Sequence, residues 1–111
     1  MSAPYIEYEN TFSLKVYGKR KRHGKEIAMK ENILFVNSAF KHGYTKDDIE
    51  RAIETKIYED NLKGEDDIYV IIGFDTIANP IEVFYNIIDN ETIKVFHAME
   101  LRDKIASQTD E

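Results

Sequence analysis

The sequence predicts a single α+β domain built on a small antiparallel sheet, and three observations support this prediction. The chain has 111 residues, a length that suits one hydrophobic core. Apolar residues near the N-terminus alternate with polar ones, as in a half-buried strand, and strand-like runs return in the second half. A helical pattern lies between the two regions. This order favours an α+β layer over an alternating α/β sheet.

Composition excludes several classes of protein. With 42% hydrophobic residues, the chain can bury enough apolar area to fold. It contains no cysteine, which excludes disulfides, thiolate zinc sites and cysteine nucleophiles. Apolar runs such as Ile33-Leu34-Phe35-Val36 are far shorter than the roughly 20 residues of a spanning helix. Residues 1–10 lack the apolar stretch of a secretory signal, so we expect a cytoplasmic protein without membrane association.

The N-terminal part reads as a hairpin. Residues 11–17 alternate in the manner of a short strand, and residues 26–29 suit a second strand, although a helix starting near Glu26 is also possible. Gly18 and Gly24 bracket a basic run between them. We therefore predict an exposed loop over 18–25, because consecutive like charges disfavour a packed element.

Two helices are predicted in the middle of the chain. The apolar cluster that begins at Ile33 predicts a short helix that ends at Lys41-His42, before Gly43. Thr45 then suits the N-cap of a second helix, because Asp48 follows three residues later. The inward stripe of this second helix consists of Ile49, Ala52 and Ile53.

The second half predicts a meander and a terminal helix. Residues 56–58 suit a brief edge strand, which could pair with the same strand of a second copy. The sequence leaves the oligomeric state open. Three β-branched and aromatic runs with short turns then predict sequential antiparallel strands over 68–74, 81–88 and 92–97. Ala98, Leu101 and Ile105 have helical spacing, and residues 107–111 read as a frayed polar tail.

Charge is distributed unevenly along this acidic chain, whose net charge is −6. Residues 13–46 contain nine Lys or Arg and two acids, a local net charge of +7, while the remainder carries −13. A surface for a polyanion and a charge match within the molecule or with a partner both remain open. The candidate RNA-binding residues on the basic arm are Lys19, Arg20, Lys21, Arg22 and Lys25. The plainer alternative is a run that keeps a hairpin tip soluble.

Motifs for cofactors and metals are absent from the sequence. It contains no phosphate-cradling glycine loop, dinucleotide fingerprint or calcium loop, so we predict no cofactor. The three histidines do not lie three or four residues apart, which argues against a locally encoded metal site. The acidic residues over 60–67 are more typical of a solvated loop than of a cation site.

Two junctions carry the residues for acid–base chemistry. Lys41 and His42 at a helix end could simply complement the helix dipole, or contact phosphate and transfer a proton. His97 and Arg102 follow at the end of the last predicted strand, where His97 could instead pack beside Met99. In that simpler reading Arg102 pairs with Glu100 or Asp103. Cleavage of RNA without a metal needs a base, an acid and cations, which His, Lys and Arg supply.

Three short motifs resemble a known family. The stretch from Lys41 to Ile49 resembles the Lys-His-Gly-Val-(Ser/Thr) helix junction of BrnT-like toxins, and Tyr69 to Gly73 resembles their Tyr-Val-x-Ile-Gly strand. Val95 to Arg102 is similar to their C-terminal strand-to-helix motif, and closer still to related small bacterial toxin-like proteins ending in His-Ala-Met-x-x-Arg. The resemblance covers residues 33–104, about two-thirds of the chain, and leaves residues 1–31 as an extension.

This resemblance implies a RelE-like fold and a metal-independent ribonuclease toxin of a type II toxin–antitoxin system. It also implies a cognate antitoxin protein and RNA as partners. The candidate catalytic residues are then Lys41, His42, His97 and Arg102, with Glu100 as a base or orienting group. The alternative is a non-catalytic binding module of the same fold, which docks on an acidic protein partner or on RNA.

Overall fold

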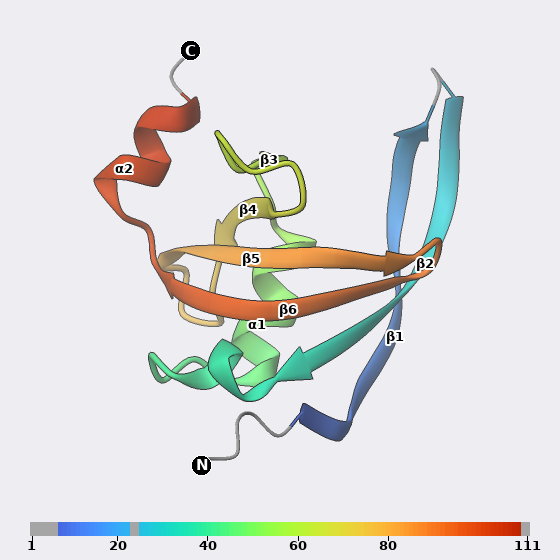
Figure 1. The fold of residues 1–111 in the computed structure, drawn as a ribbon, viewed down its shortest axis with the longest axis horizontal. Helices are drawn as coiled ribbons and strands as arrows, with labels where there is room; N and C mark the ends of the chain where they lie inside the picture. Colours follow the sequence, from blue (N-terminus) through green and yellow to red (C-terminus); the bar gives the residue numbers. More distant parts are fainter. Residues whose placement is uncertain (1–6, 23–24, 110–111) are drawn as a thin grey trace.

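The computed structural model describes the backbone of residues 7–22 and 25–109 and the side chains of residues 32–109 (Figure 1). In this part of the chain, six strands form one sheet in the order β1-β2-β6-β5-β4-β3. The strands are β1 (Glu7–Arg22), β2 (Lys25–Val36), β3 (Tyr58–Asn61), β4 (Tyr69–Phe74), β5 (Pro80–Asp89) and β6 (Thr92–Glu100). The helical segments are η1 (Asn37–Phe40), α1 (Lys46–Glu54), α2 (Asp103–Ala106) and η2 (Ser107–Thr109).

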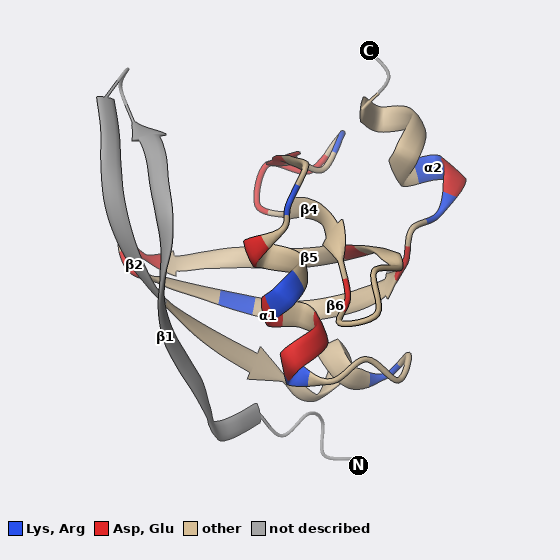
Figure 2. Ribbon diagram, turned by 180° about the vertical axis from the view of Figure 1, so that it is seen from behind, with Lys and Arg blue, Asp and Glu red and all other residues tan. Residues whose placement is uncertain are grey.

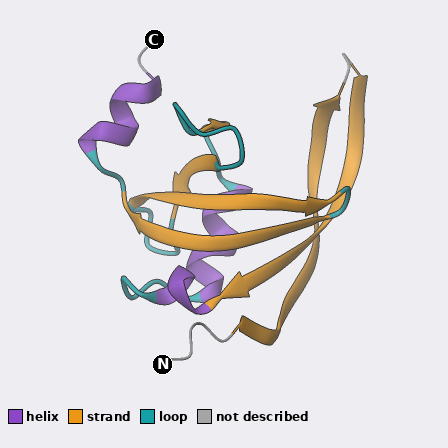
Figure 3. Cartoon of the chain, viewed as in Figure 1, coloured by secondary structure: helices purple, strands orange, loops and turns teal. Residues whose placement is uncertain are grey.

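The α+β class and the meander β4-β5-β6 are confirmed, but the sheet is mixed (Figure 3). Strands β2 and β6 pair in parallel, over residues 32–35 and 92–95. The expectation of a wholly antiparallel sheet is therefore wrong. Alternation in a sequence reveals the faces of a strand but not its direction relative to a distant partner. The segment between β2 and β6 is long enough for the crossover that parallel strands require.

The N-terminal hairpin is confirmed and is longer than expected. Strand β1 continues to Arg22, and β2 begins at Lys25, so the prediction of a loop over 18–25 is wrong. His23 and Gly24 lie outside the described residues. A register shift between Val16 and Lys19 accommodates Gly18 within the strand. The backbone of residues 19–22 pairs with that of residues 25–28, and this pairing overrides the tendency of consecutive like charges to form a loop.

Helix α1 begins as the sequence predicts. The Thr45 Oγ1 accepts a hydrogen bond from the Asp48 backbone N at 3.1 Å, and the Asp48 carboxylate accepts one from the Thr45 N at 3.0 Å. This capping box satisfies backbone donors at the first turn. The predicted stripe of Ile49, Ala52 and Ile53 is buried against the sheet.

Helix α1 covers one face of the sheet, as the view from behind shows (Figure 2). Its approach to β4 depends on Gly73, because a Cβ there would lie 1.9 Å from the Ala52 carbonyl oxygen. The main core lies between them and includes side chains from four strands: Ile33 and Phe35, Ile71, Ile81, Val83 and Tyr85, and Ile93, Val95 and Ala98. None of the helices in the described residues is long and apolar enough to cross a membrane.

The opposite face carries a smaller cluster beneath the C-terminal segment. Ile105 of α2 packs there with Val70, Ile72 and Phe84. The expected terminal helix is found as α2, but its predicted start at Ala98 is wrong, because β6 continues to Glu100 and α2 spans only four residues. The helical spacing of Ala98, Leu101 and Ile105 is misleading, since Ala98 belongs to the core under α1 and the other two to the second cluster.

Two further boundaries differ from the sequence prediction. Ile33 to Val36 end strand β2, and the helical turn that follows covers only Asn37–Phe40. Ile33 and Phe35 are buried while Asn32 and Leu34 are half-buried, which is the alternation of a strand beside β6. The predicted edge strand over 56–58 is found slightly later, as β3.

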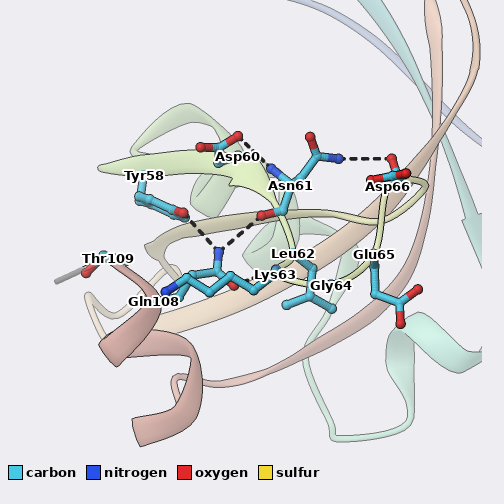
Figure 4. Close-up of a pocket in the computed structure, with 10 residues that line it drawn as sticks. All are labelled: Tyr58, Asp60, Asn61, Leu62, Lys63, Gly64, Glu65, Asp66, Gln108 and Thr109. Carbon is cyan, nitrogen blue, oxygen red and sulfur yellow. Dashed lines mark hydrogen bonds between the residues drawn. The ribbon is translucent and has the colours of Figure 1, made fainter. Parts of the chain in front are cut away.

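The C-terminal segment is docked rather than frayed over residues 107–109. Gln108 is buried, and its amide Nε2 donates to the Tyr58 hydroxyl at 2.9 Å and to the Asn61 carbonyl at 3.3 Å (Figure 4). Its Oε1 accepts from the Lys63 backbone N at 3.0 Å. The prediction of a frayed tail is wrong here because a polar residue can be buried when its hydrogen bonds are satisfied. Residues 110–111 lie outside the described part.

Candidate functional site

A buried carboxylate lies at the centre of the candidate site. Glu82 is the third residue of β5, and its side chain is completely buried. Its neighbours Ile81 and Val83 point into the core under α1, so alternation places Glu82 on the opposite face. A buried carboxylate is unfavourable unless it is paired and hydrogen-bonded.

The partners of Glu82 lie on either side of the junction between β6 and α2: His97 in β6 and Arg102 just before α2. Its Oε2 accepts a hydrogen bond from His97 Nε2 at 2.9 Å and another from Arg102 Nε at 2.8 Å. An Arg102 Nη lies 2.5 Å from the same oxygen. The Oε1 accepts from the Arg102 backbone N at 3.1 Å, so both carboxylate oxygens are used.

These contacts determine which of Glu82 and His97 carries the proton that they share. Burial raises the pKa of Glu82, but the hydrogen bonds from His97 and Arg102 outweigh it, so the pKa lies below its ordinary value of 4.5. Glu82 is therefore ionised at neutral pH. A carboxylate can only accept, so the proton in the contact belongs to His97 Nε2. In the neutral imidazole of His97, the lone pair is then on Nδ1.

The ring of His97 is positioned by the sheet. His97 lies opposite Phe84 in the register of β5 and β6, beside a bulge that leaves Phe96 without a paired residue. The centroids of the Phe84 and His97 rings are 4.3 Å apart. The His97 side chain keeps 19% of its surface exposed. The ring is thus oriented on one side by Glu82 and Phe84 and remains accessible to a ligand.

His42 reaches the same place from another part of the chain. It lies in the turn after η1 and is exposed, and its ring centroid is 5.7 Å from that of His97 in an edge-on arrangement. The η1 turn is fixed to β6 by the Ser38 hydroxyl, which donates to the Phe96 carbonyl at 2.6 Å. The two histidine junctions that the sequence singled out therefore converge.

Lys41 is exposed beside His42, its neighbour in the chain. Of the predicted catalytic residues, Glu100 does not join this cluster. Glu100 lies opposite Ile81, whose side chain faces α1, so Glu100 is on the other face of the sheet from His97. There, burial raises the pKa of the Tyr44 hydroxyl, and the charges of Asp75 and Glu100 raise it further. Glu100 is thus placed beside Tyr44 and not beside the imidazoles.

The basic arm lies apart from the cluster. Lys19, Arg20, Lys21 and Arg22 are in β1, and Lys25 begins β2, at the end of the hairpin beyond the residues that pair with β6. Figure 1 shows this end of the hairpin away from the junction of β6 with α2. Within the described residues, the hairpin and the histidine cluster are therefore two separate surfaces.

Glu82 was not among the residues predicted for the site. The signal was present: Glu82 is the one charged residue in the apolar run from Ile81 to Tyr85, inside a predicted strand. A charge at such a position implies burial with a partner. The partner of Arg102 is accordingly Glu82, neither Glu100 nor Asp103 as the simpler reading of the sequence suggested.

The arrangement combines an oriented imidazole, a second imidazole and a guanidinium at one exposed edge. Arg102 keeps 39% of its side-chain surface exposed, so N–H donors that do not face Glu82 remain available to an anion. Among the side chains that the structure describes, no group of three His, Asp or Glu residues is arranged to hold a metal ion. Comparisons with protein-family models, curated proteins and solved structures find no match to this chain.

Proposed function

We propose that this protein is a ribonuclease that cleaves RNA without a metal ion, by acid–base chemistry at the cluster of Glu82, His97, His42 and Arg102. The observation that carries the proposal is the approach of the His42 and His97 rings beside the buried Glu82–Arg102 pair. An imidazole oriented by a buried carboxylate is a suitable general base. A second imidazole within reach supplies the acid that the other half of the reaction needs.

The proposed reaction is an intramolecular transfer of the phosphate. His97 Nδ1 removes the proton from the ribose 2′-hydroxyl, and the 2′-oxygen forms a bond to phosphorus. The bond from phosphorus to the 5′-oxygen breaks, and His42 donates a proton to this leaving oxygen. The products are a 2′,3′-cyclic phosphate and a free 5′-hydroxyl, so protons and charge balance.

Charged residues assist at two points of this reaction. Glu82 is ionised, so it stabilises the imidazolium that forms on His97. Arg102 and the exposed Lys41 supply positive charge for the phosphate oxygens, on which negative charge develops in the transition state. Glu100 is left out of the proposed mechanism because it lies on the other face of the sheet.

The biological role is part of the same proposal. The resemblance of the segments 41–49, 69–73 and 95–102 to BrnT-like toxins supports a toxin of a type II toxin–antitoxin system, with an antitoxin protein as partner. It also supports a RelE-like version of the α+β fold. The basic hairpin, with residues 19–22 and 25, would contact RNA outside the catalytic cluster, and this contact should weaken as salt rises.

The enzymatic test uses purified protein and a labelled RNA oligonucleotide in the presence of a chelator. We expect cleavage that ends in a 2′,3′-cyclic phosphate, and a loss of about 100-fold or more in His97→Ala and His42→Ala. Lys94→Ala is the control, because Lys94 lies near the opposite end of β6. Equal rates in the wild type and both histidine variants would contradict the assignment of the site.

The biological test is induced expression in a bacterial host. We expect growth arrest with the wild type, normal growth with His97→Ala, and rescue when the product of the neighbouring reading frame is co-expressed. Harmless expression together with salt-sensitive RNA binding but no cleavage would favour the non-catalytic binding module instead.

A further inference from the structure

A cavity adjoins the histidine cluster. It has a volume of about 460 Å³ and lies between α2, the loop that joins β3 to β4, and the face of β5. Arg102 and Phe84 line this cavity and also contact the cluster, through Glu82 and His97 respectively. The Arg102 guanidinium could therefore contact two groups: a ligand in the cavity and a phosphate bound at the two imidazoles.

The cavity is positively charged in an acidic protein. Lys63, Arg102 and Lys104 line it, against one acidic residue, Glu65. Because Glu82 pairs with Arg102, the excess positive charge comes from Lys63 and Lys104. The whole chain has a net charge of −6, so this local excess of positive charge runs against the composition. Figure 2 shows Lys- or Arg-bearing segments in blue, next to acidic segments in red, at α2 and in the loop between β3 and β4. Such a cavity favours an anionic ligand.

The remainder of the lining is apolar. Leu62, Phe84 and Ile105 line the cavity and belong to the second hydrophobic cluster. A ligand that matches both parts combines an anionic group with a flat apolar ring. A nucleoside monophosphate has this chemistry, and its size suits a cavity of a few hundred Å³.

The wall of the cavity is fixed in place. Gln108 lines the cavity and anchors the C-terminal segment to the loop between β3 and β4 through its three hydrogen bonds. Figure 4 draws Gln108 in a neighbouring pocket, which shares this residue with the cavity. Ile105 of α2 is buried in the second hydrophobic cluster against β4 and β5. Because both ends of the segment are attached, the cavity is formed before a ligand binds, which lowers the entropy cost of binding.

We infer that this cavity binds the nucleotide next to the scissile phosphate, with its phosphate near Lys63, Lys104 and Arg102 and its base against Phe84 and Ile105. The inference rests on the proposed ribonuclease function, since it makes the cavity a subsite of the same centre. It adds a substrate preference for at least a dinucleotide, because one nucleotide unit occupies the cavity while the next phosphodiester lies at the imidazoles.

The binding test uses adenosine 5′-monophosphate as the probe and follows amide and methyl shifts of the labelled full-length protein by NMR. We expect shifts at Ile105, Leu62 and Phe84, and weaker binding of adenosine alone and of inorganic phosphate alone. Lys63→Ala and Lys104→Ala should each weaken the binding of the nucleotide about 5-fold, since each removes a partly solvated ion pair with the phosphate. Both lysines are exposed, so these variants should fold normally.

The matched control is Lys94→Ala, whose lysine lines a different cavity and should leave the affinity unchanged. An equal loss of affinity in this control would indicate a general charge effect and overturn the subsite. Equal affinity for inorganic phosphate and for the nucleotide would also overturn it, because the apolar lining would then contribute nothing.

Kinetics separate this inference from the proposed function. In the double variant Lys63→Ala/Lys104→Ala, we expect KM for RNA to rise about 10-fold while kcat stays near the wild-type value. If the double variant cleaves RNA with an unchanged KM, the proposed subsite is wrong, while the proposed ribonuclease activity still stands. The opposite result is nucleotide binding that depends on the two lysines, with no RNA cleavage by the wild type. It would support the cavity as a nucleotide-binding site and contradict the proposed ribonuclease activity.

Discussion

His97 donates a hydrogen bond of 2.9 Å from its Nε2 to the carboxylate of Glu82, which is completely buried one strand away. The same carboxylate also binds the side chain and the backbone of Arg102. One buried acid thus holds both the His97 ring in β6 and Arg102, the residue that precedes α2. Loss of this acid should therefore affect stability and chemistry together.

Glu82→Gln tests this relationship. The substitution keeps the shape of the side chain but removes the charge that pairs with Arg102. We expect a loss of about 2 kcal/mol in the free energy of unfolding, at the lower end of values for broken buried ion pairs because Arg102 is partly exposed. Urea unfolding at neutral pH measures this change. A midpoint equal to that of the wild type would contradict the role of Glu82 as the anchor of the junction.

The second prediction concerns acid stability at the start of α1. Burial raises the pKa of Asp48, but its hydrogen bonds with Thr76 and Thr45 outweigh this effect and lower the pKa from 3.8 to about 2. The charged form is therefore stabilised in the folded state. This contribution to stability is complete above pH 3.8 and is lost as the pH falls through about 2.

Asp48→Asn should accordingly be less stable than the wild type by about 1 kcal/mol at neutral pH, the usual value of a helix cap. The difference should shrink below pH 3.8 and vanish only well below pH 2, because Asp48 in the wild type is half protonated at its pKa of about 2. Urea unfolding across this pH range is the measurement. Asp47→Asn is the control, since Asp47 is exposed in the same turn; an equal effect there would point to the helix dipole instead of the capping box.

Gly73 sets the distance between α1 and the sheet. A Cβ at this position would lie 1.9 Å from the carbonyl oxygen of Ala52, and a backbone atom cannot move aside cheaply. We expect Gly73→Ala to lower the free energy of unfolding by about 3 kcal/mol or more. Thermal unfolding followed by circular dichroism measures the loss.

Gly64→Ala provides the comparison for this variant. Gly64 has a φ of +85° but has open space around it, so the substitution should lower stability by only about 1 kcal/mol through backbone strain. If the two alanine variants unfold at the same temperature, the close approach of α1 to β4 is wrong.

Gln108 attaches the C-terminal segment, and its loss should be measurable. Gln108→Ala removes three hydrogen bonds and leaves the Lys63 backbone N without its acceptor. We expect a loss of about 1–3 kcal/mol in the free energy of unfolding. Faster amide exchange at Lys63 and Ile105 should accompany it. Thr109→Ala, at an exposed neighbouring position, should change stability by no more than about 0.5 kcal/mol; a similar effect in both variants would show that Gln108 is not the anchor.

Elements with a strong local signal were predicted correctly. Thr45 and Asp48 predict the start of α1 because a capping box acts within one turn. The strands of the meander follow from their β-branched runs and short turns. The start of the terminal helix was predicted too early, because three apolar residues at helical spacing also suit a strand followed by a turn. Ala98 pairs with Val83 across the sheet, and that contact decides its conformation.

The candidate site was predicted in part. His42, His97 and Arg102 could be singled out by residue type. The sequence alone did not show that the acidic residue beside them is Glu82 and not Glu100. The bulge at Phe96 and the register of β5 against β6 decide that Glu82 shares a face with His97 and that Glu100 does not. No local pattern in the sequence specifies that register.

The sequence by itself determined the α+β class, the first turn of α1, the meander and the residue types available for acid–base chemistry, since each depends on interactions between residues close in the chain. Only the tertiary structure decided the parallel pairing of β2 with β6 and the meeting of His42 with His97. It also decided the burial of Glu82 beneath Arg102. These features join residues that lie far apart in the chain, and the packing of the whole sheet sets them.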